Sequence, residues 1–233
     1  MFGSWWSGKK NNEETMAELS MPKPWAWIRK LNSILDDNII ELNPFVPVCL
    51  DLPVQLSPWL YISDESKALD KGVLQKLGIT HVLSMNAVPS YRNRHILDFY
   101  ESLDIVNLRI HAEDAEGYNL IEKHGEECLN FLRCVQEKEG LKVVVHCVAG
   151  INRSGLISCA ALMIFEQRNV TDAVKHCRER RGTILSNKSF REELCLFAAK
   201  HDLLGEKPEG FSDEPIEKKK IGPLPIRAFD ALI

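Results

Sequence analysis

The sequence contains no long uninterrupted hydrophobic run. Its 233 residues are 45% hydrophobic and 27% charged, which is an ordinary balance for a soluble globular protein. No apolar stretch approaches the roughly 20 residues that a membrane-spanning helix requires. The N-terminus also lacks the basic region and apolar stretch of a secretory signal. We therefore expect neither a transmembrane segment nor export.

Clustered cysteines are missing as well. The seven cysteines are an odd number and are spread along the chain, unlike the spacing of a disulfide framework. No Cys-x-x-Cys or His-x-x-x-His pair provides the spacing of a zinc site. We expect no metal and no other cofactor. A reducing compartment fits this cysteine usage, so we expect a cytoplasmic protein, with the nucleus as an additional location.

The chain also has no strong imbalance of charge. Its 29 Lys and Arg against 33 Asp and Glu give a formal net charge of −4 at pH 7. Such a chain is not drawn to nucleic acid or to an anionic membrane surface by its overall charge. Nucleic acid is therefore not an expected partner, and the oligomeric state stays open.

The length fits one domain of ordinary size with an extension on each side. Residues 1–50 are expected to form a partly disordered N-terminal extension, with a short helix around 24–37 where apolar residues recur at helical spacing. For its aromatic tip (Phe2, Trp5, Trp6), weak docking to a membrane or to a protein is the alternative to disorder. Residues 205–233, which are rich in proline, are expected to be a disordered tail.

Residues 51–204 alternate short apolar runs with amphipathic segments. Strands are expected at 60–62, 81–85, 104–110 and 143–146. Helices are expected at 64–77, 120–136, 154–168, 171–180 and 187–203, with Gly78 ending the first of them and Thr171 capping the fourth. Strands separated by helices predict an α/β domain whose central, mostly parallel sheet is flanked by helices on both faces.

The most informative segment is His146-Cys147-Val148-Ala149-Gly150-Ile151-Asn152-Arg153-Ser154-Gly155. It joins a predicted strand to an apolar helix, so its backbone N–H groups and the helix dipole form an anion site. A helix N-terminus and a nearby cation lower the pKa of a cysteine below its usual value of about 8.5. The Arg153 guanidinium can bind two phosphate oxygens at once. The segment predicts attack by a Cys147 thiolate on a phosphoryl group.

The other cysteines have no comparable surroundings. We expect them to be small buried apolar residues. They are Cys49, Cys128, Cys134, Cys159, Cys177 and Cys195.

The segment resembles the His-Cys-x5-Arg-Ser/Thr loop of cysteine-based protein tyrosine phosphatases. Residues 58–64, followed by 74–85, resemble the opening of an atypical dual-specificity phosphatase. Residues 186–190 resemble a late loop of that family, although Ser186 stands where the family usually has proline. The resemblance covers about residues 52–203. It implies a protein phosphatase that hydrolyses phosphotyrosine and phosphoserine or phosphothreonine in a phosphoprotein substrate, through a phosphocysteine intermediate.

The resemblance also implies roles for further residues. A general acid must protonate the leaving oxygen. Asp114 occupies the family's acid position, and Glu113 and Glu116 in the same loop are the alternatives. Ser154 lies where the family has a hydroxyl that assists breakdown of the phosphocysteine, although serine is also an ordinary helix cap. His146 would hold the loop and tune Cys147.

The phosphate would be bound by Arg153 and by backbone N–H groups rather than by other side chains of the loop. Those N–H groups belong to Val148, Ala149, Gly150, Ile151 and Asn152.

Three alternative functions stay open. A phosphoinositide phosphatase often carries extra cations between the cysteine and the arginine of the loop, and this loop has none. Metal-independent RNA 5'-triphosphatases resemble the segment 152–155, but they tend to lack the acid that Asp114 would supply. The third alternative is a phosphoprotein-binding scaffold, although inactive relatives of that kind usually lose the cysteine or the arginine.

Overall fold

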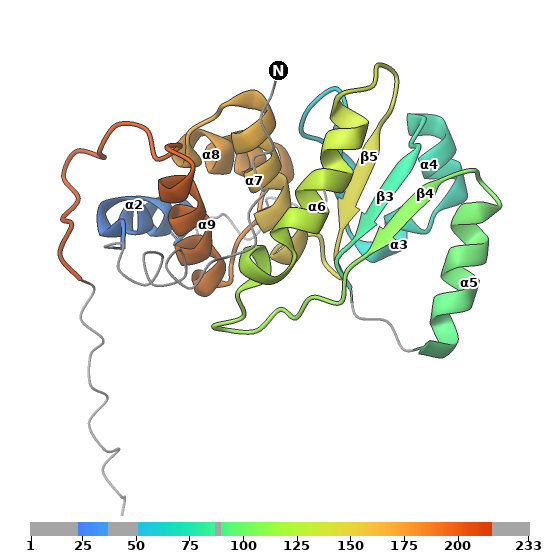
Figure 1. Cartoon of the computed structure of the whole chain (residues 1–233), viewed down its shortest axis with the longest axis horizontal. Helices are drawn as coiled ribbons and strands as arrows, with labels where there is room; N and C mark the ends of the chain where they lie inside the picture. The colour runs from blue at the N-terminus through green and yellow to red at the C-terminus, as the bar shows by residue number, and fades with distance from the viewer. Residues whose placement is uncertain (1–22, 37–50, 87–89, 216–233) are drawn as a thin grey trace, which may run out of the picture.

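A five-stranded sheet forms the centre of the protein (Figure 1). The structure, a computed structural model, describes residues 23–36, 51–86 and 90–215. The sheet has the strand order β1-β2-β5-β3-β4. Its strands are β1 (Val54–Gln55), β2 (Leu60–Ser63), β3 (His81–Ser84), β4 (Val106–Arg109) and β5 (Val143–His146). Only β1 pairs antiparallel among these strands, so the prediction of a mostly parallel sheet is confirmed.

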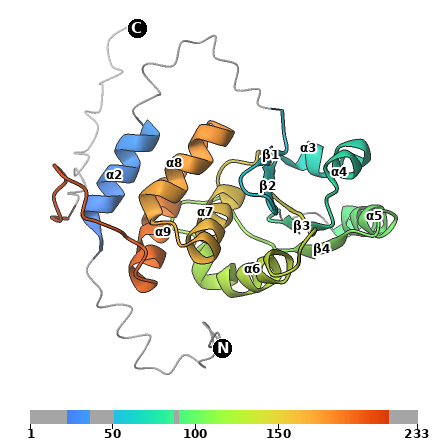
Figure 2. The same ribbon diagram turned by 90° about the horizontal axis from the view of Figure 1, so that it is seen from above.

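Helices cover both faces of the sheet, as predicted. On one side lie α3 (Glu65–Ala68), α4 (Lys71–Leu77) and α5 (Ser90–Glu101) (Figure 2). On the other side lie α6 (Leu120–Gln136), α7 (Arg153–Glu166), α8 (Val170–Arg181), α9 (Lys188–Lys200) and α2 (Trp25–Asp36). The helix α5 has no counterpart among the predicted helices.

The central strand β5 contacts the helical layers on both faces of the sheet. Every residue of this strand is buried, and three of the four are β-branched valines, which suit a strand covered on both faces. Val143 and Val145 pack into the core under α6 and α7, whereas Val144 packs into the core under α3 and α4. The alternation of side chains along a strand thus fixes β5 between two hydrophobic layers.

Two predicted helix boundaries are wrong because side-chain caps lie where the sequence analysis did not place them. The helix expected over 64–77 is split, because Asp70 adopts an extended backbone and its carboxylate accepts from Val73 N, which starts α4. The helix α8 is capped by Asn169, whose side chain accepts from Asp172 N, and not by Thr171. The predicted stop at Gly78 is confirmed.

The helix expected near residues 24–37 is present as α2, which packs against α8 and α9. Residues 205–215, which belong to the tail expected to be disordered, run beside α2, where Arg29 donates hydrogen bonds to the carbonyls of Ser212 and Glu214. The aromatic tip of the N-terminus and residues 216–233 lie outside the described residues. Within the described ranges, no helix is both long and apolar enough to cross a membrane.

The two glycines of α4 give a test of this local structure. Gly78 ends the helix at φ 67°, where an alanine is strained, so Gly78→Ala should lower the free energy of unfolding by about 1–2 kcal/mol. Gly72 lies inside the helix, where an added Cβ would be 3.4 Å from Asp70 Oδ1, an ordinary contact. Gly72→Ala should therefore raise the free energy of unfolding by about 0.4–1 kcal/mol, because alanine has less conformational freedom than glycine in the unfolded chain. Urea denaturation measures both, and changes of the same sign would contradict this account.

Candidate active site

Cys147 lies at the carboxyl end of β5, where parallel sheets commonly bind ligands. The loop of residues 147–152, called the cysteine loop below, leads from β5 directly into α7. The Cys147 side chain is only 1% exposed. Its Sγ is 3.3 Å from the Oγ of Ser154, in the first turn of α7. The structure therefore brings the predicted thiol and the predicted hydroxyl together.

The cysteine loop is held tightly against its surroundings. Gly150 has φ 67°, and a Cβ at this position would lie 2.5 Å from the carbonyl oxygen of Ser63, so the close approach to the end of β2 requires glycine. The backbone N of Glu65 donates to the carbonyl of Val148 at 3.2 Å. The backbone N of Leu185 donates to the carbonyl of Ile151 at 3.1 Å. Contacts from two sides thus fix the path of the loop.

Arg181 is a residue of the site that the sequence analysis missed. Its side chain is buried, and its guanidinium donates to the carbonyls of Gly150 at 3.1 Å and Ala149 at 3.0 Å. The C=O and N–H of one trans peptide point in opposite directions. Arg181 therefore turns the N–H groups of Gly150 and Ile151 away from itself. One arginine among several at the end of a helix gave no sequence signal for this role.

The pKa of Cys147 lies below the ordinary value of a thiol. Burial alone would raise it, but hydrogen bonds from the Ser154 hydroxyl and from the backbone N–H groups of Ser154 and Ile151, with the charge of Arg153, outweigh burial. Cys128 provides the contrast, because burial and the charge of Glu127 outweigh its one backbone hydrogen bond and raise its pKa to about 12. The site therefore stabilises the thiolate of Cys147 in particular.

Four of the other cysteines are buried, as predicted, and they are Cys128, Cys159, Cys177 and Cys195. The prediction is wrong for Cys134, which is exposed on α6. Cys49 lies outside the described residues.

His146 is the last residue of β5 and directly precedes Cys147 in the chain. Its Nε2 is 2.7 Å from the hydroxyl of Ser84 at the end of β3, and its Nδ1 is 3.4 Å from the carbonyl of Cys147. Burial lowers the pKa of this imidazole to about 4. The ring is therefore neutral near pH 7 and ties the start of the cysteine loop to the neighbouring strand.

The Arg153 guanidinium is buried beneath the cysteine loop. Its Nη1 donates to the carbonyls of Met85 and Ala112, each at 3.1 Å. Its Nε is buried and has no partner among the described atoms of the protein. An unsatisfied buried donor is unfavourable, so this N–H is disposed to bind an anion.

Asp114 lies in the segment 110–119 between β4 and α6, called the acidic loop below. Among the described residues, Asp114 is the carboxylate of the acidic loop that accepts hydrogen bonds from the cysteine loop. Asn152 Nδ2 donates to Oδ1 and Oδ2 of Asp114 at 3.2 and 3.1 Å, and Asn187 Nδ2 donates to Oδ1 at 3.2 Å. The predicted acid therefore lies at the rim of the cysteine loop. Asp114, Glu113 and Glu116 are all exposed, so the hydrogen bonds to Asn152 and Asn187 are what distinguish Asp114.

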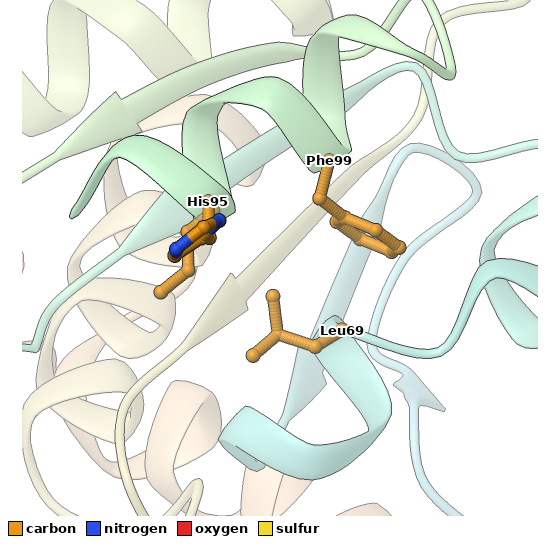
Figure 3. A pocket seen from close by; sticks show the side chains of 4 residues that line it. Leu69, His95 and Phe99 are labelled. Carbon is orange, nitrogen blue, oxygen red and sulfur yellow. The ribbon is translucent and has the colours of Figure 1, made fainter. Parts of the chain in front are cut away.

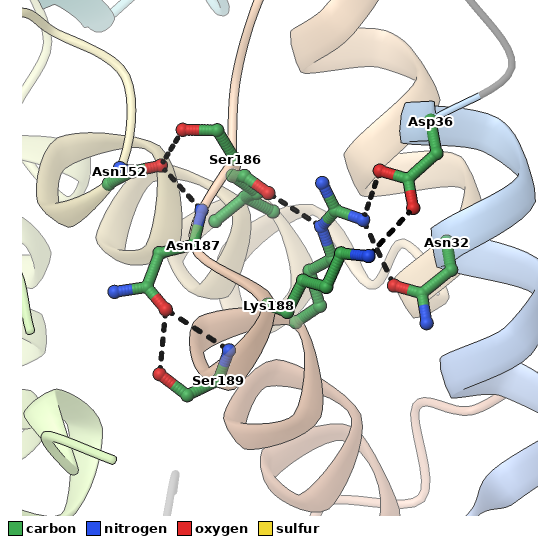
Figure 4. A network of polar contacts seen from close by, with 9 residues as sticks. Asn32, Asp36, Asn152, Ser186, Asn187, Lys188 and Ser189 are labelled. Carbon is green, nitrogen blue, oxygen red and sulfur yellow. Dashed lines mark hydrogen bonds and ion pairs between the residues drawn. The ribbon is translucent and has the colours of Figure 1, made fainter. Parts of the chain in front are cut away.

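The side chain of Asn152 has contacts that the sequence did not predict. Its Oδ1 accepts from the Ser186 hydroxyl at 2.9 Å and from the backbone N of Asn187 at 3.1 Å (Figure 4). These two donors fix the orientation of the amide, so its NH₂ must face Asp114. Ser186 replaces the proline usual in the resembled family, and it supplies a hydroxyl that proline lacks.

A separate pocket of about 270 Å³ lies between α3 and α5 (Figure 3). It is lined by Leu69, His95, Ile96 and Phe99, so it is mainly apolar and offers no fixed cation for a phosphate. None of the predicted site residues belongs to it. In the described ranges, no group of three or more His, Cys, Asp or Glu residues could hold a metal ion.

Comparison with known proteins gives the family. The family model "Dual specificity phosphatase, catalytic domain" matches residues 60–200. Human dual specificity protein phosphatase 26 is 34% identical over 137 residues, which are 59% of this chain and 63% of that relative. The match thus spans less than two thirds of the relative's length.

Two solved structures are similar over most of their own length. The crystal structure of DUSP15 superposes with a TM-score of 0.54 at 28% identity, covering 69% of this chain and 97% of that one. A human tyrosine phosphatase-like serine/threonine/tyrosine-interacting protein superposes with a TM-score of 0.52 at 26% identity, covering 64% and 96%. The matched region runs from β2 through α9 and contains the whole cysteine loop. The chain therefore belongs to the dual-specificity phosphatases of the cysteine-based protein tyrosine phosphatase superfamily.

Proposed function

We propose that this protein is a dual-specificity protein phosphatase, which hydrolyses phosphotyrosine and phosphoserine or phosphothreonine in proteins. The observation that carries the proposal is the environment of Cys147, a buried thiol whose pKa is nevertheless lowered, beside a fixed arginine with a free donor. A thiolate and a guanidinium in one loop suit nucleophilic attack on a phosphate monoester.

In the first step, the phosphate binds to the N–H groups of residues 148–152 and to Arg153. The Cys147 thiolate attacks phosphorus, so an S–P bond forms while the P–O bond to the substrate breaks. Asp114, which lies at the rim of the loop, gives its proton to the leaving oxygen. The products are a phosphocysteine and the dephosphorylated hydroxyl of the substrate.

In the second step, the phosphocysteine is hydrolysed. The carboxylate of Asp114 takes a proton from a water molecule, whose oxygen forms a bond to phosphorus as the S–P bond breaks. The departing sulfur becomes a thiolate again, and the Ser154 hydroxyl, which lies 3.3 Å away, can donate a hydrogen bond to it. Inorganic phosphate leaves, and Asp114 is protonated for the next turnover.

The side chains at the loop favour phosphoproteins over the other phosphate esters. Residues 148–152 include no cation. Val148 is a large apolar residue of this loop, and it is 57% exposed. Arg181 is near, but its Nε and Nη2 donate to loop carbonyls. A phosphoinositide with several phosphates would find little charge here. The position of Asp114 beside the cysteine loop favours an acid-assisted reaction over an RNA triphosphatase. The intact pair of Cys147 and Arg153 favours an enzyme over a scaffold.

The thiolate also bears on the compartment. A low-pKa thiolate is readily oxidised, so the enzyme requires reducing surroundings such as the cytoplasm.

The role of Ser154 can be tested through the thiol itself. Ser154→Ala removes one hydrogen bond to the sulfur and should therefore raise the pKa of Cys147. The rate of Cys147 alkylation by iodoacetamide, followed against pH by mass spectrometry, should inflect below the usual range of a thiol in the parent protein. In the variant, the inflection should move to higher pH. Ser158→Ala, a change of another buried serine of α7, is the control. An unchanged inflection in Ser154→Ala would contradict the assignment.

The nucleophile is tested by Cys147→Ser. This variant should fold but lose turnover of aryl phosphates and phosphopeptides, because an alcohol at neutral pH is a far weaker nucleophile than a thiolate. Cys134→Ser changes an exposed cysteine on α6 and should keep full activity. Hydrolysis and circular dichroism are measured side by side. A folded Cys147→Ser protein that still turns over would refute the mechanism.

The general acid is tested by Asp114→Asn. The parent rate should rise with pH as Cys147, whose pKa is lowered, becomes ionised. The variant lacks the proton donor and should therefore slow by about 10²–10⁴-fold on substrates with poor leaving groups. Very good leaving groups, which need little protonation, should be affected less.

Glu116→Gln, a change of an exposed carboxyl in the same loop, is the matched control and should keep the parent rate on poor leaving groups. If Asp114→Asn keeps that rate and Glu116→Gln loses it, the acid is Glu116 and the assignment of Asp114 is wrong.

A further inference from the structure

The helix α2 lies outside the region that the family model matches, yet it is an integral part of the packed structure. It packs against α8 and α9 (Figures 1 and 2), and its Ile28 and Leu31 are buried in the same hydrophobic cluster as residues of those helices. Other side chains of α2 bind the segment that follows α9. Trp27 Nε1 donates to the carbonyl of Leu204 at 2.9 Å, and Arg29 donates to the carbonyls of residues 212 and 214. The position of α2 is therefore fixed between α9 and the segment that follows it.

At its C-terminal end, α2 presents a carboxylate to α9. Asp36 Oδ1 accepts from Nη1 of Arg191 at 2.7 Å, and the same nitrogen donates to Asn32 Oδ1 at 3.0 Å (Figure 4). Lys188 Nζ lies 3.4 Å from Asp36 Oδ2. Burial opposes ionisation of Asp36, but Arg191 and Lys188 outweigh it and hold its pKa below the ordinary value. The buried Arg191 is thus paired with a charged carboxylate from α2.

Arg191 also reaches toward the cysteine loop. Its Nε donates to the carbonyl of Leu185 at 2.6 Å, and the backbone N of Leu185 donates to the carbonyl of Ile151. Leu185 has φ 50°, a left-handed conformation that a leucine rarely adopts. Such a conformation persists only where surrounding contacts determine it. The hydrogen bonds of Leu185 to Arg191 and Ile151 are contacts of this kind.

The next two residues hold the proposed acid. Ser186 and the backbone N of Asn187 bind Asn152 Oδ1, and the amide groups of Asn152 and Asn187 bind Asp114. A continuous set of hydrogen bonds therefore runs from α2 to Asp114 through Arg191 and the segment 185–187. The segment 185–187 also contacts the end of the cysteine loop, at Ile151 and Asn152. The part of the loop nearer to Cys147 has other supports, because Arg181 and the backbone N of Glu65 hold the carbonyls of residues 148–150.

We propose that the C-terminal end of α2 is an acid-positioning clamp, in which Asp36 and Asn32 orient Arg191 so that the segment 185–187 holds Asp114 in place. Asp36 and Arg191 are positioning residues, since neither touches the cysteine loop's sulfur or the bound phosphate. The inference rests on the proposed role of Asp114 as general acid. It predicts that loosening α2 impairs proton donation while leaving the thiolate intact.

The test is Asp36→Ala in the full chain. On a substrate with a poor leaving group, such as phenyl phosphate, kcat should fall roughly ten-fold with KM little changed, because displacement of a catalytic group is costly even when the change is remote. On an aryl phosphate with a very good leaving group the loss should be small. Alkylation of Cys147 should be unaffected. Asp36→Asn, which keeps an oxygen acceptor for Arg191, should recover part of the rate.

Lys23→Ala is the matched control. Lys23 also joins the α2 region to α9, through an ion pair with Glu192 at 2.7 Å, but it precedes the first turn of α2 and does not contact the segment 185–187. The leaving-group dependence of Lys23→Ala should match that of the parent protein. Thermal unfolding is recorded for every variant. Should Asp36→Ala fail to fold, Asn32→Ala removes the second acceptor of Arg191 and should give a smaller loss of the same kind.

Asp114→Asn, measured in parallel, separates the two ideas. If Asp114→Asn shows no leaving-group dependence, the acid assignment fails and the clamp fails with it. If Asp114→Asn shows leaving-group dependence but the α2 variants slow the reactions with poor and good leaving groups equally, the assignment of Asp114 holds and the clamp is wrong. The same conclusion follows if the α2 variants slow neither reaction. The clamp is also wrong if Lys23→Ala behaves as Asp36→Ala does.

Discussion

The rest of the structure depends on one constraint, which is the cost of keeping a negative sulfur almost fully buried. Removing a charge from water is unfavourable unless polar groups replace the lost solvation. At Cys147 those groups are the Ser154 hydroxyl, two backbone N–H groups and the charge of Arg153. These groups must be held in position. Arg181, which is buried, holds carbonyls of the cysteine loop, and the close approach of that loop to β2 leaves room only for glycine at position 150. The central strand β5 carries the sulfur because it is enclosed on both faces.

The nucleophile and the acid are supported by different parts of the chain. The groups that stabilise the sulfur come from the cysteine loop and the first turn of α7, although Arg181 and Glu65, farther along the chain, also hold that loop. Asp114 belongs to a separate loop, and its position depends on Asn152 and Asn187, which are 38 and 73 residues away in the sequence. The two partners of the proposed reaction can therefore respond differently to a change elsewhere in the protein. A sulfur held by short-range contacts tolerates distant changes better than an acid held through several side chains.

This difference also explains how much could be read from the sequence. The strand β5, the helix α6 and the cysteine loop follow from contiguous residues, and the sequence predicted them closely. The roles of Arg181 and of the Asn152 side chain depend on contacts across more than 30 residues, which no local pattern encodes. The break between α3 and α4 was missed because Asp70 acts as a cap only in its extended conformation. The path of residues 205–215 was missed because the partners of this segment are on α2.

The position of α2 has a consequence for how substrate preference would be measured. A fragment cut to the family boundaries, residues 60–200, loses Asp36 together with the segment that holds α2 in place. If the clamp acts as proposed, such a fragment keeps its thiolate but protonates leaving groups poorly. Alkoxides from serine and threonine need that proton more than the phenoxide of tyrosine does. The fragment would then be scored as a tyrosine phosphatase, and the dual specificity of the catalytic domain would become visible only when α2 is present.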